Sequence, residues 1–255
     1  MRRLEIVIVG GVVAVFGFIA VQAVKVRRAS PARAAAVAVT DTVEIPVERE
    51  SSGGSSAGDE IAGSGSDVRT VIELNRSRTY MSALVDPRDS IVRRWPLTTA
   101  RPIRIWIADP RDTPGGMIGG ERYVRQAFDD WTMVGIPVRF EMVADSARAD
   151  VTVVWRESLP EKRVGLTQMT GVNDFYTKGV IVLATHRPGG AALIPAHVSS
   201  TVLHEVGHLL GLGHANDTAS VMFPEMSNEI KPRRVAEMDR FTLRLLYTLP
   251  VGRVH

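Results

Sequence analysis

The sequence predicts an α/β fold in which helices pack on one mixed, twisted sheet of five strands. From about residue 101 onward, the patterns follow one another in the order strand, helix, four strands and helix, which is typical of packed layers of both kinds. The chain has 255 residues, of which 45% are apolar, so it can bury a sizeable core in one domain with appendages. It has no cysteine, which excludes a disulfide framework and a thiolate metal site.

Five segments have strand patterns. They are residues 102–109, 138–143, 149–157, 165–170 and 179–185. The first alternates apolar and polar side chains, as a half-buried strand does. The third is almost continuously apolar, which favours a central position in the sheet. A loop is expected at residues 171–178, between the last two strands.

Two segments have helix patterns. Residues 121–135 place apolar side chains on one stripe and end at Gly135, a residue that commonly follows a helix. Residues 195–211 form the second helix, with apolar side chains on one side that can pack on the sheet. His197 is expected at the frayed start of this helix, where it would be exposed or would cap the first turn.

The N-terminal segment has the pattern of a membrane signal. Residues 6–24 form a 19-residue stretch without charge, which is long enough to span a bilayer as a helix. The basic run at residues 25–28 favours a retained anchor, whereas cleavage of a signal peptide after Ala23 is the rival interpretation. We expect the globular part outside the cytoplasm, either as a single-pass membrane protein or secreted after cleavage.

Composition divides the chain into four parts. Residues 1–28 hold the anchor or signal, and residues 29–67 form a flexible tether rich in Ala, Gly and Ser. Residues 68–100 form an N-terminal extension, and residues 101–255 form the globular domain. Six basic residues against one acidic residue give residues 1–33 a charge of +5, so the rest carries −2 of the net +3. We therefore expect no nucleic-acid partner.

Three of the six histidines lie within eleven residues, on the second helix and just after it. His204 and His208 are one helical turn apart, so both imidazoles point the same way and can bind one Zn²⁺. Glu205 lies beside that face and can reach a water on the metal without being a ligand. His214 can be the third ligand if the chain turns sharply, and Gly211 tolerates the left-handed conformation that such a turn needs.

A family resemblance rests on three motifs. The sequence HEVGHLLGLGH at residues 204–214 matches the H-E-x-x-H-x-x-G-x-x-H signature, and the chain resembles the metzincin zinc endopeptidases. The sequence SVMFP at residues 220–224 is similar to their Met-turn. Residues 235–249 resemble the closing helix of the matrixin branch. The resemblance covers about residues 101–249.

This resemblance implies a metzincin-like α/β fold with three main helices and a catalytic zinc ion. It implies that His204, His208 and His214 bind the zinc, that Glu205 is the general base, and that Met222 is a structural residue beneath the imidazoles.

The sequence also departs from the matrixin pattern. Ala215 stands where matrixins usually carry serine, so this position does not decide which branch of the metzincins the chain resembles most. Pro224 stands where astacins and serralysins have a tyrosine ligand, which favours a matrixin-like site. Without cysteine there is no cysteine switch, so any latency would depend on residues 29–100. Structural calcium has only a weak candidate site at Asn173 and Asp174 and no other support.

These observations predict a membrane-tethered, zinc-dependent endopeptidase. A protein or peptide substrate is expected to bind as an extended strand along residues 165–169. Glu205 would take a proton from the attacking water and pass it to the leaving amine. Two alternatives are open: a tethered binding module with a structural zinc, and a zinc hydrolase of non-peptide amides.

Overall fold

The computed structural model describes residues 47–48, 65–85, 91–97, 101–225 and 231–254. The predicted anchor at residues 6–24 and most of the predicted tether lie outside these residues. Within the described part of the chain, no helix is both long enough and apolar enough to cross a membrane.

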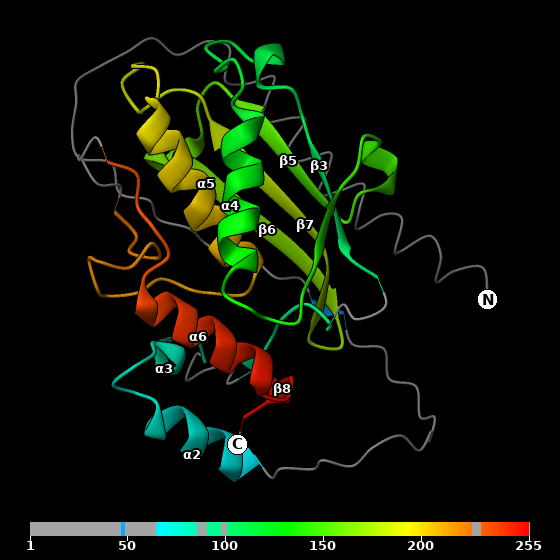
Figure 1. Ribbon diagram of the computed structural model, residues 1–255, viewed down its shortest axis with the longest axis vertical. Helices are drawn as coiled ribbons and strands as arrows, with labels where there is room; N and C mark the ends of the chain where they lie inside the picture. The colour runs from blue at the N-terminus through cyan, green and yellow to red at the C-terminus, as the bar shows by residue number, and fades with distance from the viewer. Residues whose placement is uncertain (1–46, 49–64, 86–90, 98–100, 226–230, 255) are drawn as a thin grey trace. The chain divides into compact units, whose positions relative to one another are not determined.

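The main sheet is mixed and has the predicted strands at its centre (Figure 1). These are β3 (Ile103–Ile107), β4 (Phe140–Met142), β5 (Val151–Arg156), β6 (Gly165–Val172) and β7 (Phe175–Ala184). The two-residue strand β1 (Val47–Glu48) adds a sixth member, in the order β1-β6-β7-β5-β3-β4. β6 is antiparallel to β7, whereas β7 and β5, β5 and β3, and β3 and β4 pair in parallel. The predicted mixed five-stranded sheet is thus confirmed, with β1 as an unpredicted addition.

The prediction of a loop at residues 171–178 is wrong. β6 and β7 form a hairpin that leaves only Asn173 and Asp174 between the strands. Both residues have positive φ, 51° and 65°, which is the geometry of a two-residue hairpin turn. Asn and Asp tolerate this region because their short polar side chains reduce its cost. The Asp174 carboxylate lies 3.7 Å from the Arg93 guanidinium.

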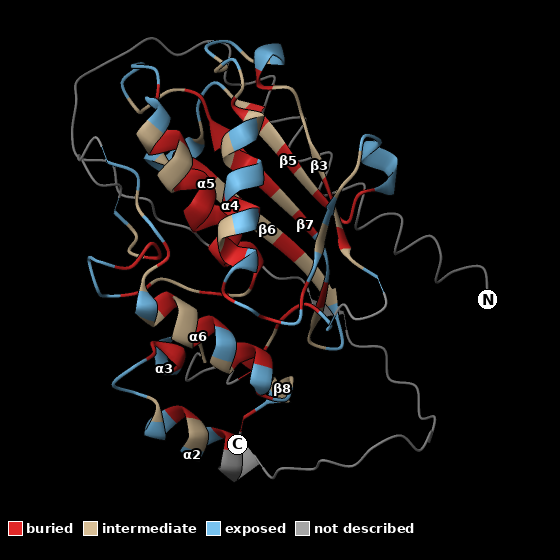
Figure 2. Ribbon diagram, in the orientation of Figure 1, coloured by how far each residue is buried: buried red, intermediate tan, exposed pale blue. Residues whose placement is uncertain are grey.

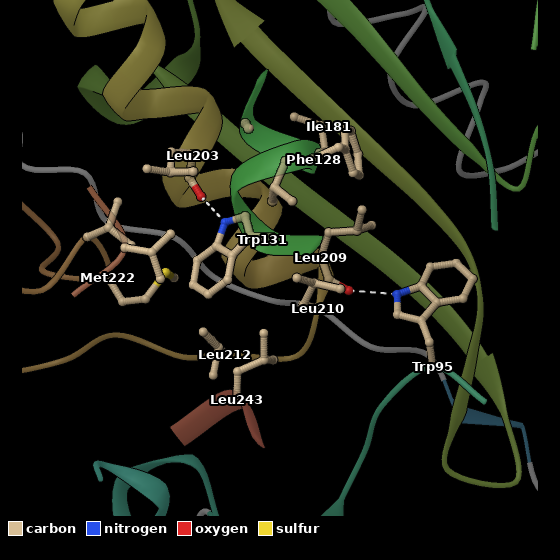
Figure 3. Close-up of a cluster of buried hydrophobic side chains, with 14 of the residues drawn as sticks. Trp95, Phe128, Trp131, Ile181, Leu203, Leu209, Leu210, Leu212, Met222 and Leu243 are labelled. Atoms are coloured by element: carbon tan, nitrogen blue, oxygen red, sulfur yellow. Dashed lines mark hydrogen bonds between the residues drawn. The ribbon is translucent and has the colours of Figure 1, made fainter. Parts of the chain in front are cut away.

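Three main helices are present, as the family resemblance implied. They are α4 (Glu121–Thr132), α5 (Pro195–Leu209) and α6 (Glu237–Thr248). α4 and α5 lie side by side over one face of the sheet (Figure 1). The predicted stripe of α4 is buried between α5 and the sheet, and the indole of Trp131 donates a hydrogen bond to the carbonyl of Leu203 at 2.8 Å (Figures 2 and 3). Burial of each such large apolar side chain stabilises the fold by roughly 1.5–3 kcal/mol.

The segment before the sheet packs against the C-terminal part of the domain. It consists of α2 (Gly65–Leu74), α3 (Met81–Leu84) and β2 (Ile91–Val92), and β2 pairs with β8 (Gly252–Arg253). The backbone amide of Tyr80 donates to the hydroxyl of Thr242 on α6 at 3.2 Å. The indole of Trp95 donates to the carbonyl of Leu209, the last residue of α5, at 2.7 Å (Figure 3). This segment therefore supports the end of α5 and one side of α6.

Candidate metal centre

Three histidines converge at the C-terminal end of α5. His204 and His208 lie one turn apart on the helix, and His214 follows the turn after it. Their ring centroids are 4.6, 4.9 and 5.3 Å apart, and one nitrogen from each lies within 4.8 Å of the others. Among the described residues, this is the one cluster of three or more potential metal ligands.

Backbone carbonyls set the tautomers of the two helical histidines. Nδ1 of His204 lies 2.7 Å from the carbonyl oxygen of Val221, and Nδ1 of His208 lies 2.7 Å from that of Leu212. A carbonyl can only accept, so each Nδ1 carries the proton and each Nε2 presents a lone pair. The two Nε2 atoms are 3.0 Å apart. Two facing lone pairs repel each other unless a cation lies between them, so the donor set fits Zn²⁺.

The turn after α5 brings His214 back towards the helix. The amide of Gly211 donates to the carbonyl of His208 at 2.9 Å, and the amide of Leu212 donates to that of Gly207 at 3.0 Å. This pair of bonds is the Schellman motif, which needs a left-handed residue after the helix. Gly211 is that residue, with a φ of 101°. A β-carbon there would also lie 3.1 Å from the carbonyl oxygen of Arg93.

Glu205 is fully buried between α5 and strand β6. Its Oε2 lies 2.6 Å from the hydroxyl of Thr167, and the same hydroxyl lies 3.0 Å from the Glu205 carbonyl oxygen. A β-carbon on Gly165 would lie 2.2 Å from Oε1 of Glu205, so only glycine fits opposite this carboxylate. From the sequence, Gly165 and Thr167 were expected only as part of the strand that binds substrate, and not as partners of Glu205. The alternation of buried and partly buried residues along β6 could have indicated them, because it puts both residues on the face of β6 that α5 covers.

Met222 lies beneath the histidine-bearing helix. Its side chain is fully buried, and a β-carbon on Gly207 of α5 would lie 2.3 Å from its sulfur. Its carbonyl accepts a hydrogen bond from the amide of Ala215 at 3.0 Å, which joins this turn to the chain segment of His214. Figure 3 shows Met222 next to Trp131 in the core below α5.

A buried carboxylate on α6 holds the same turn. Asp239 is fully buried, and it accepts from the backbone amides of Val221 at 3.0 Å and Ala236 at 2.9 Å. It also accepts from the hydroxyls of Ser220 and of Tyr80, the latter at 3.1 Å. Burial, and next the negative charge of Asp239, raise the pKa of Tyr80 well above its usual value, so this phenol stays a donor. The segment before the sheet, which contains Tyr80, thereby reaches the turn that orients His204.

Arg233 holds the segment that follows Met222. Its guanidinium donates to the carbonyls of Phe223 at 3.0 Å and of Glu225 at 2.8 Å, and its backbone amide donates to the hydroxyl of Ser200 at 2.9 Å. Residues 223–225 are therefore tied to the first half of α5.

The expectation that His197 is exposed or caps the helix is wrong. His197 is buried in the first turns of α5, and the Arg187 guanidinium lies 2.8 Å from its Nδ1. Burial, and next the charge of Arg187, lower the pKa of His197. The loop between β7 and α5 carries Arg187 back over the helix start, which a helical periodicity does not reveal.

Two adjacent imidazoles on a helix, a third beyond a glycine turn and a neighbouring buried glutamate define a site of the zinc metallopeptidase class. Residues 193–248 match the family model described as matrixin. These residues contain all three histidines, Glu205 and Met222.

Two plant proteins are among the similar curated sequences. "Metalloendoproteinase 1" of Glycine max is 38% identical over 50 residues, which are 20% of this chain and 16% of that protein. "Metalloendoproteinase 1-MMP" of Arabidopsis thaliana is 27% identical over 124 residues, which are 42% of this chain and 32% of that protein. The matches thus span less than a third of the length of either relative.

These findings confirm the predicted resemblance: the chain contains a matrixin-like metalloprotease domain. They support metalloendopeptidase as the class of enzyme, and zinc as the cofactor that His204, His208 and His214 would hold.

Proposed function

We propose that this chain is a zinc-dependent endopeptidase that hydrolyses peptide bonds in protein or peptide substrates. The observation that carries the proposal is the convergence of three imidazole nitrogens within 4.8 Å, beside a fully buried glutamate, in a segment that matches the matrixins. A structural zinc site has no use for an adjacent carboxylate that is not a ligand, so the geometry favours catalysis over a binding module.

The roles of the residues follow from their chemistry. His204, His208 and His214 would hold Zn²⁺, which lowers the pKa of water and polarises a carbonyl when bound at such a site. Glu205 accepts the proton of the attacking water and then delivers it to the nitrogen of the leaving amine, as a positioned general base and acid does. Because Glu205 is fully buried, its carboxylate is shielded from bulk water.

The substrate binds as an added strand on the outer edge of β6. The carbonyl of Val164 accepts a hydrogen bond from the amide of Ala184 at 2.8 Å, so the backbone of residue 164 faces β7. Backbone groups alternate along a strand, which turns those of Gly165, Thr167 and Met169 to the outer edge. In the described part of the chain, β1 pairs on this edge only at Gly171 and Val172. A substrate strand along residues 165–169 would lie over Glu205.

The proposal includes a membrane tether at residues 6–24, with the catalytic domain outside the cytoplasm. The support is the uncharged 19-residue stretch followed by basic residues. The test is N-terminal sequencing of the mature protein, which should show a chain that retains these residues. A mature chain that begins at Val24 would make the enzyme a secreted one.

Glu205→Gln in the full chain tests the catalytic proposal. Gln keeps the size and polarity but cannot accept the proton, so hydrolysis of a mixed peptide library should fall by about 10²–10⁴-fold. Zinc content should stay near one equivalent per chain. A wild-type protein that binds zinc but cleaves no peptide would instead support the binding module with a structural zinc. Loss of zinc in Glu205→Gln would mean that the ligand set is wrong.

A further inference from the structure

We propose that Thr167 is a positioning residue for Glu205, and that its hydroxyl fixes the orientation of the carboxylate that takes part in proton transfer. The inference rests on the proposed function and assigns to the edge strand β6 a second role besides pairing with substrate. It concerns a residue outside the zinc-binding motif, 38 positions before Glu205 in the sequence.

The contact is short and shielded. The Thr167 hydroxyl and the Glu205 Oε2 are 2.6 Å apart, and Thr167 is 1% exposed while Glu205 is fully buried. Such a distance is typical of a hydroxyl that donates to an ionised carboxylate, which is a stronger bond than one between neutral groups. The Thr167 hydroxyl has one proton and two possible acceptors, the carbonyl oxygen and Oε2 of Glu205. The nearer acceptor, Oε2, receives the proton. The carbonyl oxygen of Glu205, at 3.0 Å, is the more distant acceptor.

Gly165 limits the carboxylate from the other side. Gly165 and Thr167 lie two positions apart on the same face of β6. A β-carbon on Gly165 would lie 2.2 Å from Oε1 of Glu205 and 2.7 Å from its Cδ. The carboxylate therefore lies directly against the backbone of Gly165, while the hydroxyl of Thr167 holds its other oxygen. The terminal torsion of a glutamate is broad and roughly two-fold, and this pair of contacts restricts it to one setting.

The orientation of the Glu205 carboxylate determines where it can exchange a proton. A general base must lie within hydrogen-bond reach of the proton that it takes, and a small displacement of the base lowers the reaction rate strongly. Thr167 acts through Glu205 and does not itself touch the reacting atoms.

Thr167→Val tests this role because valine has the shape of threonine without the hydroxyl. We expect kcat to fall by about 10–100-fold with KM changed by less than about 2-fold, since the loss affects a transition-state step. Zinc content should stay near one equivalent. Thr167→Ser, which restores a hydroxyl, should bring kcat back to within about 3-fold of wild type. Thr170→Val, the same change on the same strand away from Glu205, should leave kcat and KM unchanged.

Crystal structures of the zinc-loaded wild type and Thr167→Val give a readout that does not depend on activity. The carboxylate of Glu205 should rotate about its terminal torsion in the variant and keep its setting in the wild type. An unchanged carboxylate together with an unchanged kcat would overturn the positioning role. A loss of zinc or of folding that serine does not rescue would also overturn it, because Thr167 would then serve the fold alone. If the wild type cleaves no peptide, the proposed function fails, whereas the carboxylate setting is still decided by the two structures.

Discussion

The candidate site combines two regions that are encoded in different ways. The ligand segment, residues 204–214, is eleven residues long and runs along the end of α5 and its glycine turn. The supporting groups come from other elements: Thr167 on β6 and Val221 on the turn before α6 contact the ligand segment, and Asp239 on α6 holds Val221. The ligand segment determines which atoms can bind a metal. The supporting groups determine how those atoms are oriented.

The difference has a simple physical origin. Helix geometry brings residues four positions apart onto one face, so the spacing of His204 and His208 is sufficient to place them together. No comparable local rule places the carbonyl of Val221 against Nδ1 of His204. That contact depends on the turn around Met222, which Asp239 holds by accepting hydrogen bonds from Ser220 and Val221. Changes in the ligand segment should therefore mainly reduce zinc affinity, whereas changes in the groups that hold the Met222 turn should mainly reduce stability and reduce zinc affinity less.

The largest effect is expected in the ligand segment. His214→Ala removes one of the three proposed ligands, and zinc affinity should fall by more than about 100-fold, beyond the loss usual for an outer hydrogen-bond partner. The measurement is a zinc titration against a competing chelator.

His197→Ala is the matched control for that variant, because His197 is also a buried histidine of α5 but contacts Arg187. Its zinc affinity should stay within about 3-fold of wild type. Equal losses in the two variants would show that the site depends on the packing of α5 rather than on His214 as a ligand.

The next effect is expected in the supporting groups. Asp239→Asn keeps the shape of the side chain but replaces one accepting oxygen by an NH2 group, which faces hydroxyl and amide donors. The free energy of unfolding should therefore fall by about 2–4 kcal/mol. Zinc affinity should fall by about 10-fold, because the turn that presents the Val221 carbonyl to His204 is loosened. Urea denaturation and the same chelator titration measure the two quantities.

Asp217→Asn is its control, since Asp217 is an exposed residue of the same segment and its oxygen accepts from Ala219 as an asparagine oxygen can. The change should cost less than about 0.5 kcal/mol. If Asp239→Asn proved equally mild, the Met222 turn would be held by packing and not by its carboxylate.

Periodicity and motif spacing predicted the sheet, the helices α4 and α5 and the ligand segment, whereas α6 was implied by the family resemblance. Each of these depends on local rules: alternation in β5, a stripe on α4, and a glycine after α5. The same alternation contained the face of β6 on which Gly165 and Thr167 lie. It did not reveal Glu205 opposite them, because the packing of a helix on a strand brings together residues 38 positions apart.

The wrong expectations also follow from tertiary context. The polar composition of residues 171–178 suggested a loop, but pairing with β6 and a tolerant Asn-Asp turn extend the strand through most of it. His197 looked like a residue at a frayed helix end, and a guanidinium from the preceding loop covers it. In both cases a tertiary contact, with the neighbouring strand or with a side chain from a loop, overrides the local pattern.

A cluster of charged residues at the N-terminal end of β5 can be compared with the supporting groups of the candidate site. It is also assembled from residues distant in the sequence, but we expect it to affect stability and not zinc binding. Asp150 is 5% exposed and lies 3.2 Å from Arg104 and 3.0 Å from Arg101. Burial by itself would raise the pKa of Asp150, but hydrogen bonds from the side chain and backbone of Arg104, and then Arg101, lower it to about 2. An unfolded aspartate has a pKa of about 3.9.

The folded pKa is therefore depressed, so the stabilisation is present above about pH 4 and is lost as the pH falls towards 2. Above about pH 4, Asp150 should account for about 2–3 kcal/mol of the free energy of unfolding. In urea denaturation at pH 7 and pH 2, Asp150→Asn should be clearly less stable than wild type at pH 7, and the gap should narrow at pH 2. Zinc affinity at pH 7 should stay that of wild type, which separates this cluster from Asp239. A gap that persists unchanged at pH 2 would mean that Asp150 contributes through packing and not through its charge.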